Sequence, residues 1–396
     1  MSLIKQFVRG DKAIWAIMIC LYVISFVVGY TSMGQLAYKS GNYWGPISGH
    51  ATYLFLAFIA TVVVSQFKLK WFSMASTLFW PVSLILLVIT LGIGTKVNGA
   101  SRWLLGIQPS EVAKITLIGT TAFVLSIRER FTEKSLFYGI VIATAATCGL
   151  IVSENFSTAL LLGTVILSMM IIGNISAKRI ILLIAGIVLF VGVVIALCEA
   201  FPKQQEQYLD RYSTWRNRLI STDSNNGDEM DPAWLFNKQN AQKSYAKMAI
   251  SEANLFVIGR GPGNSRQRDY LPQPYSDFVF AIIIEEYGFF GALLIMGLFF
   301  SLMLRIAYLA GQSQNPFARY MLYGCGLVIV LQALINLAVG SCLGPVTGQP
   351  LPLISRGGSS IVSTGIYFGI ILSISHYDAV ANGKVTQHHH EPHPLP

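Results

Sequence analysis

Long apolar runs separated by shorter polar segments dominate the pattern of this chain. Most of these runs approach or exceed the roughly 20 residues that a helix needs to cross the ~30 Å hydrocarbon layer of a bilayer. There are ten of them, at about residues 13–33, 50–66, 71–93, 110–127, 136–153, 157–174, 179–200, 277–304, 317–342 and 358–377. Backbone polar groups must be satisfied internally in a membrane, so each run is expected to be a helix. The pattern predicts an all-α integral membrane protein, a polytopic bundle of ten transmembrane helices.

Composition supports the same class of protein. Of the 396 residues, 53% are hydrophobic and 12% are charged, with a mean hydropathy of +0.56. Ordinary globular chains carry roughly 25% charged residues. A soluble enzyme with an unusually apolar core is therefore excluded. The first run is long and lacks a small-residue cleavage site, so we expect it to remain as the first spanning helix.

The distribution of Lys and Arg predicts the orientation. With ten spans both termini lie on one side, and thirteen Lys and Arg residues fall in the segments of that side, against four in the short loops opposite. Positive charge marks the cytoplasmic side. We therefore expect cytoplasmic termini, a membrane domain of residues 1–378 and a solvated cytoplasmic tail of residues 379–396. The net charge of +9 follows from this arrangement, and no nucleic-acid partner is predicted.

The largest polar interruption is the segment of residues 201–276, which the orientation places outside the cytoplasm. Residues 208–220 and 239–253 have helical composition, whereas residues 221–231 are rich in Asn and Asp and are expected to form a flexible connection. Loops of this length are usually functional or disordered. We expect two short helices on the outer surface, with the end of the loop leading into the eighth apolar run.

Acidic residues gather where this loop enters the eighth run. Asp277 either caps the helix, as acidic residues often do, or acts as a general base if desolvation raises its pKa. Glu285 and Glu286 follow eight and nine residues later, roughly 12 Å deeper along a helix. A carboxylate there costs several kcal/mol unless it is paired or lines a wet cavity. Glu111 and Lys114 are potential partners, and a buried ion pair and a cavity wall both remain open.

Other polar residues near the predicted outer surface match an anionic ligand. Three arginines precede Asp277: Arg260, Arg266 and Arg268. Guanidinium groups match phosphate oxygens, although solvated arginines on the surface are an equal alternative. Arg102 and Trp103 fit either an interfacial anchor or a substrate contact. Gly357 and Gly358 precede the last run, where free backbone amides can hold an anion.

Several other chemistries have no support in the sequence. There is no nucleotide-binding glycine loop and no metalloprotease motif, His50 and His376 are isolated, and the five cysteines lack metal or redox spacing. We therefore predict no metal site built from these residues and no nucleotide cofactor, and leave a divalent cation open. An outward-facing enzyme without nucleotides needs a substrate with its own leaving group, and a lipid-linked pyrophosphate sugar meets that requirement.

Four motifs occur together in this chain. They are Asn98-Gly-Ala-Ser-Arg-Trp103 followed by Gln108-Pro-Ser-Glu-Val-Ala-Lys114; Gly261-x-Gly-Asn-Ser265 with Leu271-Pro272 and Ser276-Asp-Phe-Val-Phe-Ala281; Glu285-Glu286-x-Gly288; and Gly348-Gln-Pro-Leu-Pro352 leading to Ser355-x-Gly-Gly-Ser-Ser360. In this combination, over roughly residues 10–378, the chain resembles the SEDS family of FtsW/RodA peptidoglycan glycosyltransferases. The Gly-Asn-Ser motif resembles the division-type FtsW branch more closely than the elongation-type RodA branch.

The resemblance implies a ten-helix enzyme that polymerises lipid II, an undecaprenyl-pyrophosphate-linked disaccharide peptide, at the outer face of the membrane. Undecaprenyl pyrophosphate is the implied by-product. The implied partners are a class B penicillin-binding protein and other proteins of the division or elongation complex. Together with the position of Asp277 before the eighth run, the resemblance implies that Asp277 is the catalytic base. The candidate substrate-binding residues are Arg102, Trp103, Lys114, Arg260, Asn264, Ser265, Arg266, Arg268, Glu285, Glu286, Ser355, Gly357, Gly358 and Ser359.

The chain departs from the family between the fifth and sixth runs. Family members commonly carry Pro-Asp followed by an aliphatic or aromatic residue and Gly-Thr, whereas here Asn155 replaces the Asp and Ser157 the Gly. A role for that carboxylate is in doubt here, unless Glu154 substitutes for it. Two other functions remain open from the residues alone. The intramembrane charges also fit a transporter that flips a lipid-linked precursor, and a scaffold that only activates a partner is a third alternative.

Overall fold

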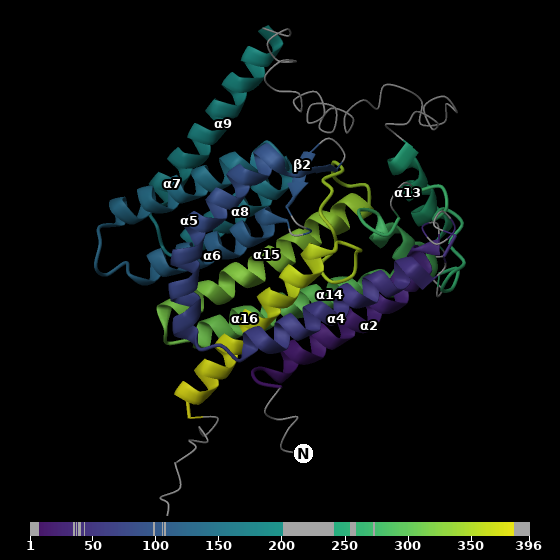
Figure 1. Ribbon diagram of the computed structural model, residues 1–396, viewed down its shortest axis with the longest axis horizontal. Coiled ribbons are helices and arrows are strands. Elements are labelled where there is room, and N and C mark those ends of the chain that lie inside the picture. The colour runs from purple at the N-terminus through teal and green to yellow at the C-terminus, as the bar shows by residue number, and fades with distance from the viewer. Residues whose placement is uncertain are drawn as a thin grey trace, which may run out of the picture.

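The structure, a computed structural model, is a bundle of helices with a short β-hairpin at one end (Figure 1). It describes residues 8–34, 36, 38, 41–42, 44–97, 100–104, 106, 108–200, 241–253, 259–271 and 274–383. The elements are α2 (Lys12–Ser32), α4 (Trp44–Ser65), α5 (Leu69–Ile93), β1 (Thr95–Val97), β2 (Ala100–Trp103), α6 (Pro109–Ser126), α7 (Glu133–Val152), α8 (Phe156–Ile172), α9 (Ala177–Ala200), α13 (Ala241–Glu252), α14 (Val279–Gln312), α15 (Pro316–Gly340) and α16 (Ser359–Ala381).

A helix lies over each of the ten apolar runs. Within the described residues, eight helices are long and apolar enough to cross a membrane, and α6 and α8 are not among them. Helix α8 has only 17 residues. The protein is therefore a multi-pass helical membrane protein, and the number of ten spans stays a prediction.

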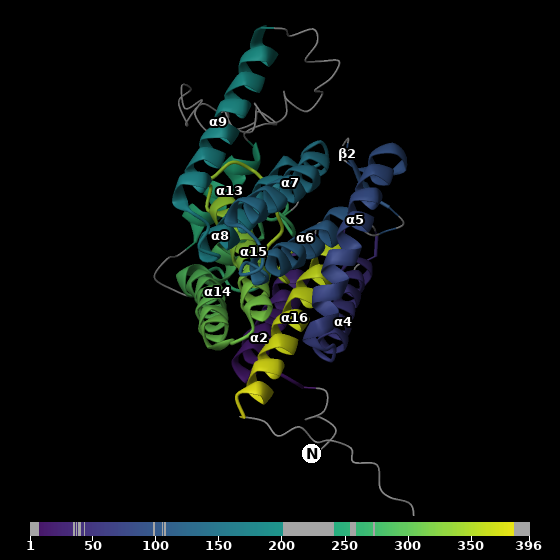
Figure 2. The same cartoon turned by 90° about the vertical axis from the view of Figure 1, so that its left-hand side faces the viewer.

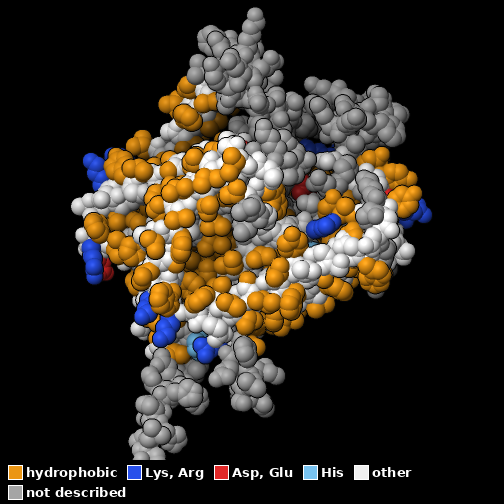
Figure 3. Space-filling model, in the orientation of Figure 1, with side chains coloured by type: hydrophobic (Ala, Val, Ile, Leu, Met, Phe, Trp, Pro, Cys, Tyr) orange, Lys and Arg blue, Asp and Glu red, His pale blue; other side chains and the backbone are white. Residues whose placement is uncertain are grey.

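The hydrophobic core lies along α15 and α16. In their most apolar stretches 67% and 78% of the residues are buried, against 6% in α9. Helix α9 stands away from the rest of the bundle in both views (Figures 1 and 2). Figure 3 shows hydrophobic side chains spread over most of one face, with Lys and Arg near its margins. A surface of this kind is stable against lipid chains, as the composition predicts.

Close approach of α16 to α4 depends on small residues. A Cβ at Gly365 would lie 2.4 Å from the carbonyl oxygen of Ala57. The Thr61 hydroxyl donates a hydrogen bond to the carbonyl of Gly365 at 2.8 Å. Helix pairs in membranes commonly combine such small residues with hydroxyl bonds. The contact holds α4 beside the central helix.

Polar contacts join the chain's two terminal spans at one end of the bundle. The amide of Asp11, just before α2, donates to the Ser375 hydroxyl of α16 at 2.9 Å. The Asp11 carboxylate pairs with Arg305 of α14. The start of α2 and the end of α16 therefore lie together. The hairpin lies at the other end, where α5 ends and α6 begins (Figure 1).

The structure adds to, and in part departs from, the predicted local structure. The stretch from Asn98 to Leu104 was predicted to be an outer loop, but residues 100–103 form strand β2, which pairs with β1 so that Val97 lies opposite Ala100. The predicted helix of residues 239–253 is confirmed by α13. The predicted helix 208–220, the connection 221–231 and the tail beyond residue 383 lie outside the described residues.

Candidate functional site

Asp277 lies in a turn directly before α14. The helix begins at Val279, and its N-cap residue is Phe278, which makes no side-chain cap hydrogen bond. Asp277 is therefore one residue before the N-cap residue and does not occupy the N-cap position that one of the two alternatives gave it. Its carboxylate accepts a hydrogen bond from the Ser276 hydroxyl at 3.0 Å and is partly exposed.

The segment after α15 is bonded to this turn. The Ser355 hydroxyl donates to the carbonyl of Ser276 at 2.7 Å and accepts from the amide of Leu351 at 2.9 Å. The amide of Arg356 donates to the carbonyl of Tyr275 at 2.9 Å, and its guanidinium carbon lies 5.9 Å from the centre of the Tyr275 ring. The predicted site residue Ser355 thus fixes the backbone beside Asp277, and Arg356, which the sequence reasoning did not select, lies there too.

Buried amide side chains hold the same segment from behind. Asn336 of α15 donates to the carbonyls of Asp277 and Gln349, at 3.2 Å and 2.8 Å. The Gln349 side chain donates to the hydroxyl of Thr158 on α8 at 2.9 Å. Sequence reasoning missed Asn336, although it lies four residues after Gln332 in an apolar helix. Polar residues inside a membrane helix are a known signal of function.

Trp103 and the glycines before α16 come together at the same end of the bundle. The Trp103 ring lies 3.7 Å from the place that a Cβ on Gly358 would occupy, and so does the Tyr53 ring. Gly358 has a φ of 48° and is the N-cap residue of α16. The Ser359 hydroxyl is buried and has no hydrogen-bond partner among the described residues. Arg102 lies on β2, and its side chain is outside the described part of the structure.

Helix α14 is interrupted at Gly288, where φ is 67° and ψ is −158°. The interruption leaves carbonyls of the preceding turn to bond elsewhere. The amide of Arg260 donates to the carbonyl of Glu285, and the amide of Gly261 to that of Glu286, both at 2.9 Å. A Cβ on Gly259 would lie 2.5 Å from the backbone of Glu286. The loop of residues 259–268 is therefore fitted against the kink.

The Glu285 carboxylate binds this loop as well. It accepts hydrogen bonds from the hydroxyl of Ser265 at 2.5 Å, the amide of Arg266 at 2.7 Å and the amide of Gln267 at 3.4 Å. Glu286 is also fully buried, beside Thr31, although neither of its oxygens has a hydrogen-bond partner among the described residues. The expected pairing of these glutamates with Lys114 is not present.

Lys114 instead pairs with Glu111 one turn away on α6, at 2.8 Å. The Lys114 side chain is 1% exposed. The buried ion pair of Lys114 therefore lies within α6 and does not include Glu285 or Glu286, the partners considered from the sequence. Lys114 and the α14 glutamates are therefore parts of separate polar groups.

The three arginines of the loop differ in their surroundings. Arg260 pairs with Glu252 of α13 at 2.7 Å, and Arg268 donates to the carbonyl of Thr31 at 2.9 Å and pairs with Asp269 at 3.2 Å. Arg266 is exposed and makes no ion pair within the described part of the chain. Asn264 is exposed and donates to the carbonyl of Arg260 at 3.2 Å. Only one of the three guanidinium groups is thus left for a ligand.

Helix α13 packs against the start of α14, where Ala246 and Phe278 belong to one buried cluster. Burial of Lys243 lowers the pKa of its ammonium, and nearby Lys247 lowers it further, whereas Cys342 acts in the opposite direction. Burial raises the pKa of the Cys342 thiol.

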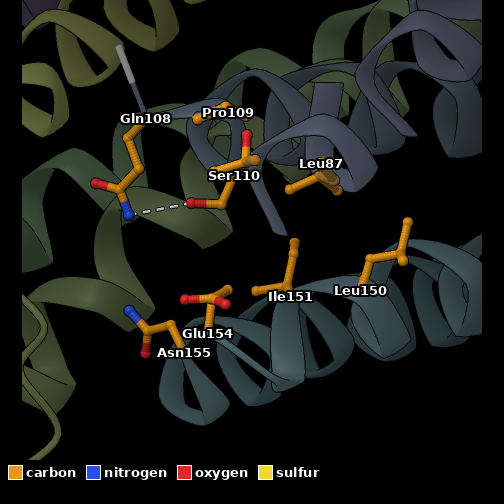
Figure 4. A pocket seen from close by; sticks show the side chains of 9 residues that line it. Leu87, Gln108, Pro109, Ser110, Leu150, Ile151, Glu154 and Asn155 are labelled. Atoms are coloured by element: carbon orange, nitrogen blue, oxygen red, sulfur yellow. Dashed lines mark hydrogen bonds between the residues drawn. The ribbon is translucent and has the colours of Figure 1, made fainter. Parts of the chain in front are cut away.

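Asn155, where the family resemblance predicts an Asp, is the N-cap residue of α8. Its side-chain oxygen accepts a hydrogen bond from the amide of Thr158 at 3.2 Å. Together with Glu154, Gln108 and Ser110 it lines a cavity of about 20 Å³, which is room for about one water molecule. Figure 4 shows the polar ends of these side chains around the opening. Asn155 thus caps α8 as an Asp at this position would, without the negative charge.

The described residues contain no group of three or more His, Cys, Asp and Glu side chains placed to hold a metal ion. What they do contain at this end of the bundle is a partly exposed carboxylate, Asp277, on a backbone fixed from two sides. A carboxylate so placed can accept a proton from a bound hydroxyl group. Exposed Arg266 and partly exposed Arg356 supply positive charge at the same end.

Fold and site together define a multi-pass helical membrane protein with a carboxylate and guanidinium groups gathered at one end of the bundle. The family model described as "Cell cycle protein", for FtsW, RodA and SpoVE, matches residues 11–380. The chain belongs to the FtsW/RodA/SpoVE family.

Its relatives include proteins named "Probable peptidoglycan glycosyltransferase FtsW". That of Trichlorobacter lovleyi is 33% identical over 304 residues, 74% of each chain. That of Halomonas elongata is 28% identical over 371 residues, 89% of this chain and 87% of the relative. Two solved structures share the fold. A chain of a peptidoglycan synthase complex has a TM-score of 0.68, 22% identity and coverage of 93% and 98%. The rod shape determining protein RodA of Thermus thermophilus has a TM-score of 0.63, 21% identity and coverage of 93% and 97%.

Proposed function

We propose that this protein is a peptidoglycan glycosyltransferase that polymerises lipid II into glycan strands, and that it does so for cell division. Its membership of the family, and relatives named peptidoglycan glycosyltransferase FtsW, support the activity and the role. The observation that carries the assignment of the base is the position of Asp277. It is a partly exposed carboxylate on a turn whose backbone is bonded to Ser355 and Asn336.

In the proposed reaction, Asp277 takes the proton of an acceptor sugar hydroxyl. The hydroxyl oxygen forms a bond to the anomeric carbon of the donor sugar, and the bond from that carbon to the pyrophosphate oxygen breaks. The electron pair of the broken bond leaves with undecaprenyl pyrophosphate. Positive groups near the leaving group stabilise the charge that develops on it. A turn fixed in advance lowers the entropic cost of placing the base.

The placement in the membrane is part of this proposal. Ten spans, cytoplasmic termini in the inner membrane and an outward-facing site agree with the Lys and Arg distribution. They also agree with the meeting of α2 and α16 at the end of the bundle away from the hairpin. A class B penicillin-binding protein is the proposed partner, because a chain of similar fold comes from a peptidoglycan synthase complex.

The test is polymerisation of labelled lipid II by the full chain in lipid nanodiscs, with and without its cognate transpeptidase and with and without a divalent cation. We expect polymer from the wild type and none above background from Asp277→Asn. Lipid II that crosses a vesicle membrane without forming polymer would instead identify a flippase. Full activity of Asp277→Asn would remove the assignment of the base.

A further inference from the structure

Two backbone amides of the 259–268 loop, those of Arg266 and Gln267, donate to a carboxylate of the protein itself, that of Glu285. Glycines with positive φ at positions 261 and 263 and the run of amides after Ser265 resemble an anion-binding nest. The amides of Arg266 and Gln267 both donate to the Glu285 carboxylate, with the Ser265 hydroxyl. The anion of this nest is therefore Glu285, and these donors are not available to a phosphate group.

The same contacts determine which arginine faces outwards. Two carboxylates, those of Glu252 and Glu285, lie 2.7 Å and 3.9 Å from Arg260, so its charge is balanced within the protein. Arg268 is held by the end of α2 and by Asp269. Between them, Arg266 has its amide bound to Glu285 at 2.7 Å while its side chain is exposed. Arg266 is thus held at its backbone by Glu285, while its side chain stays exposed.

The loop also follows the beginning of α14. Ser265 contacts Glu285, and Leu271 belongs to one buried cluster with Phe278, the N-cap residue of α14, seven residues before Glu285. Seven residues are close to two helical turns, so both contacts lie on one face, about 10 Å apart along the axis. Residues 265–271 therefore run along α14 from the kink towards the turn that carries Asp277.

We propose that Glu285 is a positioning residue, which folds the 259–268 loop against the kink so that the Arg266 guanidinium contacts the pyrophosphate of the lipid substrate. Arg260 and Arg268 then stabilise the loop and do not contact the substrate. This inference rests on the proposed function, since it names the residue that recognises the leaving group. Loss of Arg266 weakens binding of the diphosphate, and loss of the Glu285 charge loosens the loop.

Competition between lipid II and undecaprenyl pyrophosphate tests the Arg266 contact in the full chain. We expect Arg266→Ala to raise the inhibition constant of undecaprenyl pyrophosphate about ten- to hundredfold, as loss of a charge-assisted hydrogen bond implies. Undecaprenyl monophosphate has fewer anionic oxygens, so Arg266→Ala should raise its inhibition constant less. Arg266→Lys should restore only part of the affinity, because Lys lacks the planar fork. Glu129→Gln, an exposed carboxylate in the turn after α6, is the control.

Hydrogen exchange of residues 259–271 tests the role of Glu285. Glu285→Gln should speed exchange of the Arg266 and Gln267 amides at least about tenfold and weaken diphosphate binding, whereas Arg266→Ala should leave exchange unchanged. In the Glu285→Gln protein, Arg266→Ala should weaken diphosphate binding less than it does in the wild type. If Glu285→Gln does not fold, Ser265→Ala probes the same contact from the loop.

Three outcomes would overturn the proposal. The first is that Arg266→Ala leaves inhibition by undecaprenyl pyrophosphate unchanged. The second is that Arg260→Ala weakens this inhibition as much as Arg266→Ala does, without faster hydrogen exchange of the loop. The third is that neither Glu285→Gln nor Ser265→Ala changes hydrogen exchange of the loop. Strong loss in Arg356→Ala with none in Arg266→Ala would assign the contact elsewhere. If the wild type makes no polymer, the proposed function is wrong. Direct binding of undecaprenyl pyrophosphate to the wild type and to Arg266→Ala then still tests whether Arg266 contacts the diphosphate.

Discussion

Asn336 connects the turn of Asp277 to the segment that precedes α16. Its side-chain amide donates one hydrogen bond to the carbonyl of Asp277 at 3.2 Å and another to the carbonyl of Gln349 at 2.8 Å. The side chain is fully buried. One side chain on α15 therefore sets the separation of two backbone segments that carry candidate site residues.

Replacement of this amide should lower both stability and activity. Asn336→Leu has similar size but no donors, and a buried carbonyl without a partner costs about 1–3 kcal/mol. We expect a lower thermal midpoint in nanodiscs and a lower polymerisation rate with little change in apparent KM. Gln332→Leu, which removes a single bond to the carbonyl of Pro350, is the matched control and should have the smaller effect. Wild-type rate and midpoint in Asn336→Leu would contradict this account.

Close contact at Gly259 gives a second prediction. A Cβ there would lie 2.5 Å from backbone atoms of Glu286, which cannot move like the end of a side chain. Gly263 also has positive φ, at 79°, but no atom lies within 4 Å of its Cβ position. Gly263→Ala should therefore cost only backbone strain, of order 1 kcal/mol, and Gly259→Ala considerably more.

Proteolysis of the loop and thermal unfolding distinguish these two variants. We expect Gly259→Ala to expose the 259–268 loop to protease at temperatures where Gly263→Ala is still protected. Equal protection in both variants would show that the loop is not fitted against the kink in solution.

The helices were the predictable part of this fold, because their pattern reflects the membrane. A helix lies over every predicted apolar run, and Gly358 precedes α16 as expected. The hairpin was missed, although Asn98-Gly99 between two short polar runs is a common signal for a tight turn. Strands of three and four residues are too short for an alternating pattern to stand out.

The candidate site was predictable in its residue types and less so in its contacts. The motifs selected Ser355 and Glu285, but a sequence carries no distances that would separate a substrate contact from a contact with the protein's own backbone. Lys114 was a potential partner of Glu285 because both are charged and a charge in apolar surroundings needs a partner. A nest of loop amides met that demand instead. These contacts join residues that are 18 to 20 positions apart in the chain, so they depend on the tertiary structure.

Asn155 provides a third prediction, because one substitution keeps its capping hydrogen bond to α8 and another removes it. Asn155→Asp retains the acceptor for the Thr158 amide and adds a charge that the helix N-terminus favours, so stability should stay equal or rise by about 0.3–1 kcal/mol. Asn155→Ala should lose about 1 kcal/mol. It should also lower activity, since Thr158 accepts the hydrogen bond of Gln349 in the site segment.

Thermal unfolding and polymerisation of both variants provide the measurement. Ser153→Ala, a neighbouring exposed residue that does not cap α8, is the control. A gain in activity for Asn155→Asp above the wild type would indicate that the carboxylate common in relatives has a chemical role beyond the cap. Stability of Asn155→Ala equal to that of the wild type would contradict the capping role.

The ion pair of Asp11 and Arg305 predicts a pH dependence of stability at the other end of the bundle. Burial alone would raise the pKa of Asp11, but hydrogen bonds from Arg305 and from the amides of Ile14 and Ala13 outweigh it, and the net direction is downward. A carboxylate with a lowered pKa stabilises the fold above its unfolded value, about 3.9, and loses this contribution as pH falls through the folded value. The window therefore lies below about pH 4.

Asp11→Asn isolates this effect, because Asn still caps α2 while the charge is removed. We expect the wild type to have the higher thermal midpoint at pH 7, and the difference between the two proteins to shrink as pH falls from about 4 towards 2. High salt should reduce the difference at pH 7, since the pair is partly exposed. Glu129→Gln, which lacks such a pair, should show no comparable convergence with the wild type. A midpoint difference that is constant with pH would mean that the Asp11 charge does not stabilise the bundle.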